Sequence, residues 1–337
     1  MIQKFTLVLA LIAGICFKTT AQDVHFSQQY AARLQINPAF AGISSDYSIT
    51  AGHRNQWPSL RGSFTTSYLS ADYRFKEQKS AVGLVASADE SGNAGLTRLQ
   101  VGGIYAYHTD LSDFVTVSAA VQAMYGSQRI DFSSLVFGDQ LSDNGFVNAS
   151  TQERDIFDPV NYASFATGAV VYTRQFWLSV AAAHLNQPDL GFASGSRLPT
   201  RITINTGYRF YISSYFAENR IYEFSVIPSI TYTRQGIFNK TEIGLYTNYT
   251  PLTFGLVYRG ISFTNSFASD HAIAAIAGIN LEKIRLAYSY DIGLSGITAK
   301  TGGAHEVSVT FEELNLTKIT KKLYTDKKYR RISCPAF

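Results

Sequence analysis

A ladder of short segments, in which apolar and polar side chains alternate, runs from about Asp46 to Phe311. The alternation is clearest in residues 221–233. The apolar face there carries Tyr222, Phe224, Val226, Pro228, Ile230 and Tyr232. The polar face carries Glu223, Ser225, Ser229, Thr231 and Thr233, with Ile227 as the one exception. Strands that are apolar on one face and polar on the other suit a closed barrel in lipid. The sequence therefore predicts an all-β fold, a transmembrane antiparallel β-barrel.

The ladder divides into about fourteen segments, each long enough for a tilted strand to cross a bilayer. They are 46–56, 63–75, 80–89, 94–108, 113–127, 161–174, 176–185, 200–213, 220–233, 240–250, 251–260, 270–281, 284–293 and 303–313. An even number is typical of bacterial single-chain barrels, because it returns both ends of the chain to one side.

The connections between these segments fall into two alternating sets of unequal length. The short set is 76–79, 109–112, the turn at Gln175, 214–219, the junction at Thr250–Pro251 and 282–283. The longer set includes 128–160, 186–199, 261–269 and 294–302, although its members 90–93 and 234–239 are short. Outer-membrane barrels have short periplasmic turns and longer outside loops. The pattern predicts a Gram-negative outer-membrane location with both termini in the periplasm.

The first residues read as a secretory signal. Lys4 precedes an apolar run, and small side chains follow at 19–21, which predicts a signal peptide over 1–21 cut before Gln22. Removing Lys4 and Lys18 from the 29 basic residues leaves 27 against 25 acidic ones, which is not a nucleic-acid-binding balance. Cys334 is then the single cysteine, which excludes an internal disulfide.

Two parts of the mature chain fall outside the predicted barrel, 46–313. Residues 22–45 show no strand alternation and are predicted as a periplasmic or lumen segment that enters from the periplasm. Residues 314–337 hold seven basic residues and one acidic residue and are predicted as a periplasmic tail. The tail is either a solvated extension or a docking segment for an acidic partner.

A soluble β-sandwich also alternates, and it is the main alternative fold. It accounts less well for the unequal connections and for the many tyrosines near strand ends, where a membrane interface favours them.

No strong catalytic, cofactor or metal motif is present, and the six histidines are scattered along the chain. The sequence therefore predicts a protein that is not an enzyme and has no cofactor. A barrel hydrolase remains a weaker alternative, in which His305 and Glu306 act with Asp291 on the preceding segment. Structural hydrogen bonding at the end of the wall is the more ordinary role for these three residues.

Inward positions carry both signs of charge. They are Arg201, Arg209, Glu223, Glu242, Arg285, Asp291 and Glu306. Charges in a narrow lumen must be paired or hydrated. Mixed signs therefore predict a cross-linked, partly filled interior in preference to a selectivity ring of one sign.

Arg54 and Trp57 stand where the first segment meets its outer connection, and Arg61 follows closely. Arg54 and Trp57 suit the aromatic girdle and cap of a barrel, but arginines and aromatics also dominate binding surfaces. We predict partner-binding roles for Arg54, Trp57 and Arg61, and for Asp139 and Asp155 in the long 128–160 connection.

Several motifs together resemble the PorP/SprF family of outer-membrane proteins of the type IX secretion system of Bacteroidetes. They are Gln28-Gln29-Tyr30, Asn37-Pro38-Ala39-Phe40-Ala41-Gly42, Arg54-Asn55-Gln56-Trp57, His184-Leu185-Asn186-Gln187-Pro188, Tyr288-Ser289-Tyr290-Asp291 and Gly303-Ala304-His305-Glu306. The resemblance covers about 22–311 and leaves the tail unmatched.

The resemblance implies an accessory barrel that works with the secretion and gliding machinery. Its implied partners are other type IX secretion components and the C-terminal domain of a secreted adhesin or other cargo, anchored at the cell surface or helped in export. The residue pattern itself predicts a lipid bilayer as a further partner, and the charge balance argues against nucleic acid as a partner. An outer-membrane channel for small or apolar solutes is the alternative function.

Overall fold

A computed structural model describes residues 23–75, 77–92, 95–131, 136–142, 145–146, 158–192, 195–217, 220–261, 271–281, 283–294 and 301–312. The predicted signal peptide, the basic tail and Asp155 lie outside these residues.

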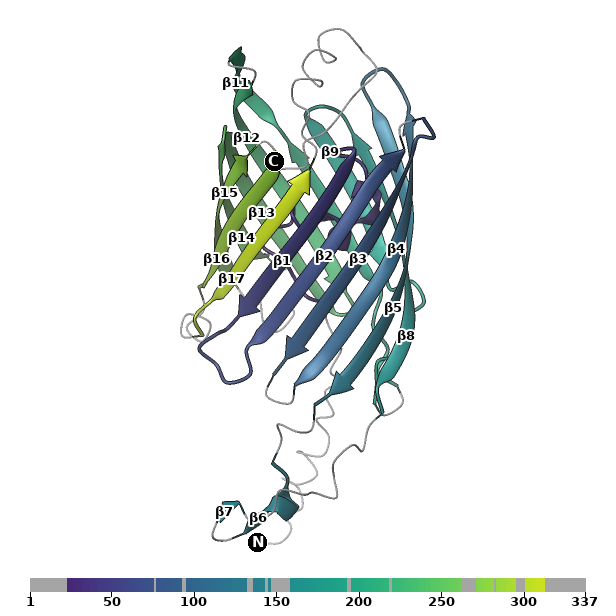
Figure 1. Cartoon of the computed structure of the whole chain (residues 1–337), viewed down its shortest axis with the longest axis vertical. Helices are drawn as coiled ribbons and strands as arrows, with labels where there is room; N and C mark the ends of the chain where they lie inside the picture. Colours follow the sequence, from purple (N-terminus) through teal and green to yellow (C-terminus); the bar gives the residue numbers. More distant parts are fainter. Residues whose placement is uncertain are drawn as a thin grey trace, which may run out of the picture.

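The chain forms a tall barrel of tilted strands (Figure 1). The first wall strands are β1 (Tyr47–Gln56), β2 (Phe64–Phe75), β3 (Ser80–Ser91), β4 (Leu96–Asp110), β5 (Thr116–Ile130), β8 (Val160–Tyr172) and β9 (Phe176–Ala183). The others are β10 (Arg201–Tyr208), β11 (Phe210–Ala217), β12 (Arg220–Gln235), β13 (Phe238–Tyr249), β14 (Leu252–Ile261), β15 (Ala272–Leu281), β16 (Ile284–Gly293) and β17 (Ala304–Glu312). Between β5 and β8 lie η3 (Gly138–Gln140) and the small hairpin of β6 (Leu141–Ser142) and β7 (Gly145–Phe146).

Every wall strand pairs antiparallel with its neighbours, and two contacts close the ring. Strand β1 pairs with β17, and β10 pairs with both β9 and β12. Only Arg209 separates β10 from β11, so these two form one wall strand, and the fifteen strands of the sheet occupy fourteen positions. The predicted closed antiparallel barrel is confirmed. Closure of the ring lets the backbone donors and acceptors of every wall strand pair with a neighbouring strand, as the interior of a bilayer requires.

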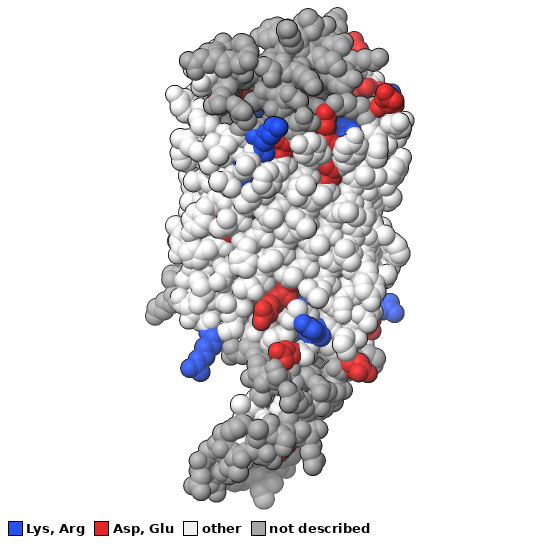
Figure 2. All heavy atoms as spheres, in the orientation of Figure 1, with Lys and Arg blue, Asp and Glu red and all other residues white. Residues whose placement is uncertain are grey.

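The wall alternates as predicted between an apolar outer face and a polar inner face. On β16 and β17, Tyr288, Val307 and Phe311 are exposed on the outer face, while Asp291 and Glu306 are buried in the interior. Ile227, the exception noted in the alternation, also points inward and is fully buried. Figure 2 shows the charged side chains of one face gathered toward its two ends, with a belt of few charges between them. Such a belt suits hydrocarbon.

The two ends of the barrel differ as the connections predicted. Short turns join β2 to β3, β8 to β9 and β15 to β16 at one end, whereas the 131–159 and 184–200 connections lie at the other. The predicted turn 214–219 is an exception. The strands there continue to Ala217 and restart at Arg220, because this stretch is rich in aromatic residues that favour strand. Within the described residues, no helix has the length and apolarity needed to span a membrane.

Residues 23–45 lie inside the barrel, and we call them the plug. The plug contains α2 (Arg33–Ile36) and η1 (Pro38–Phe40). It begins at the long-connection end, where the Asp23 amide donates to Gln235 at 3.0 Å. It ends at the short-turn end, where the Arg74 amide donates to the Asp46 carbonyl. The plug therefore runs through the lumen from the long-connection end to the short-turn end.

Candidate functional site

Apolar side chains of the plug fill the middle of the lumen. Tyr30, Leu34 and Phe40 are buried in one cluster with inward side chains of the wall. The wall contributes residues from strands on opposite sides, among them Val85, Ile104, Trp177, Ile227, Tyr246 and Val257. The rings of Tyr30 and Tyr246 meet edge to face, with centroids 6.0 Å apart. Each such large side chain stabilises the packing by about 1.5–3 kcal/mol. The plug is thus packed against the wall around the ring.

Asn37 fastens the turn between α2 and η1 to the wall. Its side-chain oxygen caps η1 by accepting from the Ala39 amide at 2.9 Å. Its amide nitrogen donates to the carbonyls of Ala169 and Val180, at 3.2 and 3.1 Å. Gly168 on β8 leaves the space for this contact, since a Cβ there would lie 2.0 Å from the Asn37 side-chain oxygen.

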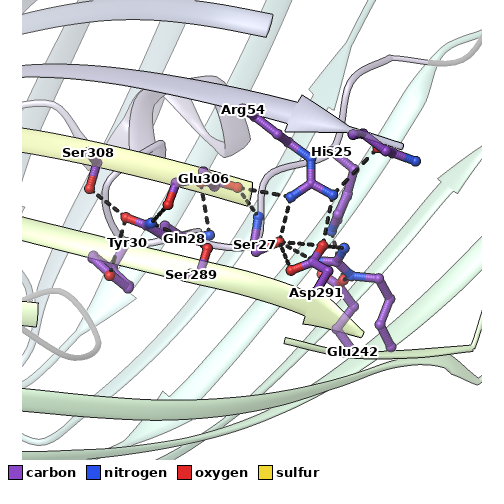
Figure 3. A network of polar contacts seen from close by, with 12 residues as sticks. His25, Ser27, Gln28, Tyr30, Arg54, Glu242, Ser289, Asp291, Glu306 and Ser308 are labelled. Carbon is purple, nitrogen blue, oxygen red and sulfur yellow. Dashed lines mark hydrogen bonds and ion pairs between the residues drawn. The ribbon is translucent and has the colours of Figure 1, made fainter. Parts of the chain in front are cut away.

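The first charged contact between plug and wall centres on Arg54 of β1 (Figure 3). Its guanidinium donates to Glu306 of β17 at 3.1 Å and to Asp291 of β16 at 2.7 Å. It also donates to the Ser27 hydroxyl of the plug at 2.7 Å. Glu306 in turn accepts from the backbone amides of Ser27 and Gln28, at 2.7 and 3.1 Å. We call these residues the central clamp, because charged wall residues hold the plug backbone through them.

A second arginine extends the central clamp across the lumen. Arg259 of β14 donates to Asp291 at 2.7 Å and to Glu242 of β13 at 2.6 Å. Glu242 also accepts from Gln29 of the plug, and His25 Nε2 lies 2.7 Å from its carboxylate. Burial, reinforced by the cations of Lys240 and Arg259, lowers the pKa of His25 to about 4 against the opposing effect of Glu242. His25 is therefore a neutral donor at pH 7.

A separate group of charges holds the plug near the short-turn end. Arg33 donates to Asp72 of β2 at 2.8 Å and to Glu312 of β17 at 3.0 Å. Arg285 of β16 completes the pairing of Glu312 at 2.9 Å. Asp72 also accepts from the Gly42 amide at 2.7 Å. All these charges are largely shielded from water, where an unpaired ion costs several kcal/mol.

A third group surrounds Asp23 at the long-connection end. Arg201 lies 3.0 Å and His184 Nε2 2.7 Å from the Asp23 carboxylate, and Ser164 bonds the other ring nitrogen of His184 at 2.8 Å. Burial works to raise the pKa of Asp23, but Arg201, the His184 hydrogen bond and Arg98 outweigh it, so the pKa lies below its usual range. Asp23 therefore stays ionised and paired. The predicted cross-linked interior of mixed charge is confirmed by these three groups.

Two cavities lie where the plug meets the long-connection end, and together we call them the vestibule. One holds about 240 Å³ and is lined by Asp89, Arg98, Gln122, Arg201 and Gln235, among others. The other holds about 340 Å³ and is lined by Trp57, Phe64, Arg259, His271 and Gly303, among others. Asp23, Val24, His25, Thr66 and Lys240 line both. The vestibule is a polar recess whose floor is the start of the plug.

The residues predicted to bind a partner are not gathered at one place. Arg54 is 3% exposed and faces the lumen, so its predicted role in a surface contact is corrected to one in the central clamp. The alternation of β1 explains this, since Arg54 shares a face with Ser48 and Thr50. Trp57 lines the vestibule and packs edge to face on Phe64, while Arg61 and Asp139 are exposed in connections. Asp155 lies outside the described residues.

The three residues of the hydrolase alternative are not brought together. Glu306 and Asp291 face the lumen, whereas His305 faces outward. The ring of His305 lies 4.8 Å from that of Tyr290, and its Nδ1 is 2.8 Å from the Tyr288 hydroxyl. The wall backbone thus stands between the histidine and the carboxylates.

Sequence reasoning missed the plug side of these contacts. Ser27 and Arg33 were not singled out, nor were their wall partners Asp72 and Arg259. The sequence held one indication of the plug. Residues 28–42 precede the strands and lack the alternation of a barrel wall, so they have another role. Its polar residues, among them Gln28, Arg33 and Asn37, hydrogen-bond to the wall, and its apolar residues pack against the wall.

These features define a class of protein, a membrane-spanning barrel whose lumen is occupied by its own N-terminal segment. The chain belongs to a particular family, because residues 18–311 match the family described as "Type IX secretion system membrane protein PorP/SprF". Fold and family place it in the outer membrane and in type IX secretion. The match includes the plug and every wall strand except the last residue of β17.

Solved outer-membrane barrels are similar in outline. The toluene transporter TbuX of Ralstonia pickettii is 12% identical, with a TM-score of 0.42, over 83% of this chain and 91% of that one. A triple mutant of the Rhodopseudomonas blastica porin is 10% identical, with a TM-score of 0.35, over 79% of this chain and 98% of that one. Comparison with curated proteins finds no significant match.

Proposed function

We propose that this protein is a non-enzymatic barrel of the type IX secretion and gliding machinery that holds a secreted adhesin's C-terminal domain at the cell surface or helps its export. The observation that carries the proposal is the plug. With its lumen occupied along most of its length, the barrel offers partners its two ends and its outer wall, in preference to a path through the middle.

The long-connection end suits a protein ligand better than the other end does. The vestibule opens there, the longest connection begins after Ile130, and Arg61 and Asp139 are exposed on that side. The vestibule lining combines Trp57 and Phe64 with Lys240 and Arg98, and so offers apolar anchors beside cations. Protein interfaces favour such a combination. In this proposal the long connections face the outside of the cell.

The test is a deletion of Asp139 to Asp155 in cells that display the cargo. We expect the cargo to be released into the medium while the barrel stays heat-modifiable on a gel. A matched control replaces the exposed Leu111 and Phe114 of the short turn at the opposite end by serine, and it should leave the cargo attached. Cargo that stays on cells after the loop deletion would contradict the proposal.

The alternative, a channel for small or apolar solutes, receives support from the vestibule alone. Planar bilayers containing the purified protein distinguish the two functions. Steady conductance of the wild-type protein would favour the channel, and a silent bilayer favours the binding function. The hydrolase alternative predicts a lipid or peptide hydrolysis that His305→Ala abolishes. With His305 on the outer face of the wall, we expect no such activity.

A further inference from the structure

One hairpin of the barrel continues beyond the rim at the short-turn end. Strand β9 pairs with β10 only as far as Tyr208, and β13 pairs with β12 only as far as Phe224. Past these points β11 pairs with β12 alone, from Phe210 to Ala217. Figure 1 shows β11 and β12 rising above the other strands. Among the described residues, the second edge of β11 has no strand beside it.

This free edge lacks the usual protection. Exposed sheet edges are normally interrupted by charges or proline, which prevent pairing with other chains. The sequence of β11, FYISSYFA, contains neither. A bulge between Tyr211 and Ser213 is the one protective feature, and it lies at the base of the projection. Ile212 is 58% exposed and Tyr215 is 60% exposed, so apolar side chains stand beside an edge that no described strand pairs with.

The projection is also too thin to be stable in water by itself. Two-stranded ribbons are marginal, and a third strand or a packing layer is normally needed. Tyr215 stacks on Tyr222 with ring centroids 5.3 Å apart, which covers one side of the ribbon only in part. The backbone donors and acceptors along the β11 edge are best matched by an extended strand, so an extended strand is the partner that would complete the ribbon.

A second copy of the chain does not fit this edge. Antiparallel pairing of two β11 edges requires a two-fold axis perpendicular to the sheet, and this axis lies in the membrane plane. The two barrels would then point in opposite directions, whereas copies in one membrane point the same way.

Two occupants of the edge remain, the chain's own residues 314–337 and a strand of another protein, and charge distinguishes between them. The turn between β8 and β9 lies at the base of the free edge, where the Gln175 carbonyl accepts from the Arg209 amide at 2.7 Å. A strand added to β11 would therefore have one end next to this turn. Arg174 in the same turn is exposed. The chain's own residues 314–337, with seven basic residues and one acidic residue, would bring like charge to Arg174.

We propose that the free edge of β11 binds an extended strand of another protein on the short-turn side of the membrane. That strand carries apolar side chains at alternate positions and an acidic residue at the end next to Arg174. This is a second interaction surface, at the opposite end of the barrel from the vestibule, and it does not depend on the cargo-binding function.

The test places a photoreactive residue at Ser214 or at Phe216, beyond the bulge of β11, in the full-length protein in native outer membranes. We expect both positions to crosslink to one segment of one other protein, at residues two apart, as strand pairing requires. A photoreactive residue at Phe254, exposed on the outer wall, is the control and should crosslink to no such segment.

Two variants make the test specific. Tyr215→Lys should abolish both crosslinks, and Arg174→Glu should weaken them while Arg174→Lys preserves them, with the barrel heat-modifiable in each case. Crosslinks to residues 314–337 of the same chain, crosslinks without the spacing of two residues, or no peptide crosslink at all would overturn the proposal.

Discussion

Replacing Arg54 by methionine removes the centre of the central clamp and tests how the plug is held. Glu306, which is fully buried, would keep only the Ser27 and Gln28 amides, whereas Asp291 would keep Arg259 at 2.7 Å. Breaking a buried ion pair by removing one partner costs about 3–5 kcal/mol. Because Asp291 stays paired, we expect the lower end of this range, about 3 kcal/mol.

The assay is urea unfolding of the barrel in lipid vesicles, followed by the fluorescence of Trp57 and Trp177. Arg61→Met is the matched control, since Arg61 is exposed, and it should change the free energy of unfolding by no more than about 0.5 kcal/mol. Adding Glu306→Gln to Arg54→Met removes the unpaired charge and should recover about 1–2 kcal/mol. If Arg54→Met costs no more than Arg61→Met, the central clamp does not stabilise the barrel and this reasoning fails.

Three further changes test other parts of the plug. Asn37→Ala removes hydrogen bonds to two wall carbonyls and the cap of η1, and should lower the free energy of unfolding by about 2 kcal/mol in the same assay. Gly42→Ala places a Cβ 2.6 Å from that of Ala81 at a φ of +69°, and should cost about 1–3 kcal/mol, whereas Gly103→Ala, with no atom within 4 Å of the added Cβ, should cost little. The pKa of His25 is about 4 in the folded protein against 6.5 ordinarily, so the unfolded chain takes up the proton first as the pH falls. Stability should therefore drop between pH 6.5 and 4, by about 3 kcal/mol at most, and His25→Gln should drop less over this range; equal pH dependence of the two proteins would refute the assignment.

The barrel wall follows from the sequence almost strand by strand. The period of two in β12, β16 and β17 decides which side chains meet lipid, and this local pattern needs no knowledge of the rest of the chain. It also placed Glu242, Asp291 and Glu306 inside, where a charge without a partner would be too costly. Mixed signs on that face were enough to predict ion pairs.

The identity of the pairs was beyond sequence reasoning, because each joins residues far apart in the chain. Arg54 and Glu306 are 252 positions apart, and their contact exists because β1 and β17 close the ring. The alternation of β1, and not a long-range contact, makes Arg54 a lumen residue although a surface role was predicted for it. The plug has no period, so its path through the lumen depends on individual contacts such as those of Asn37 and Ser27.

The central claim is that residues 23–45 occupy the lumen of a membrane barrel. Single-channel recording in planar bilayers tests it most directly, with the wild-type protein compared with a variant that lacks 23–45, once heat-modifiability shows that both are folded. The account predicts a silent wild-type protein and steady conductance of the variant. Equal conductance of the two proteins would contradict it.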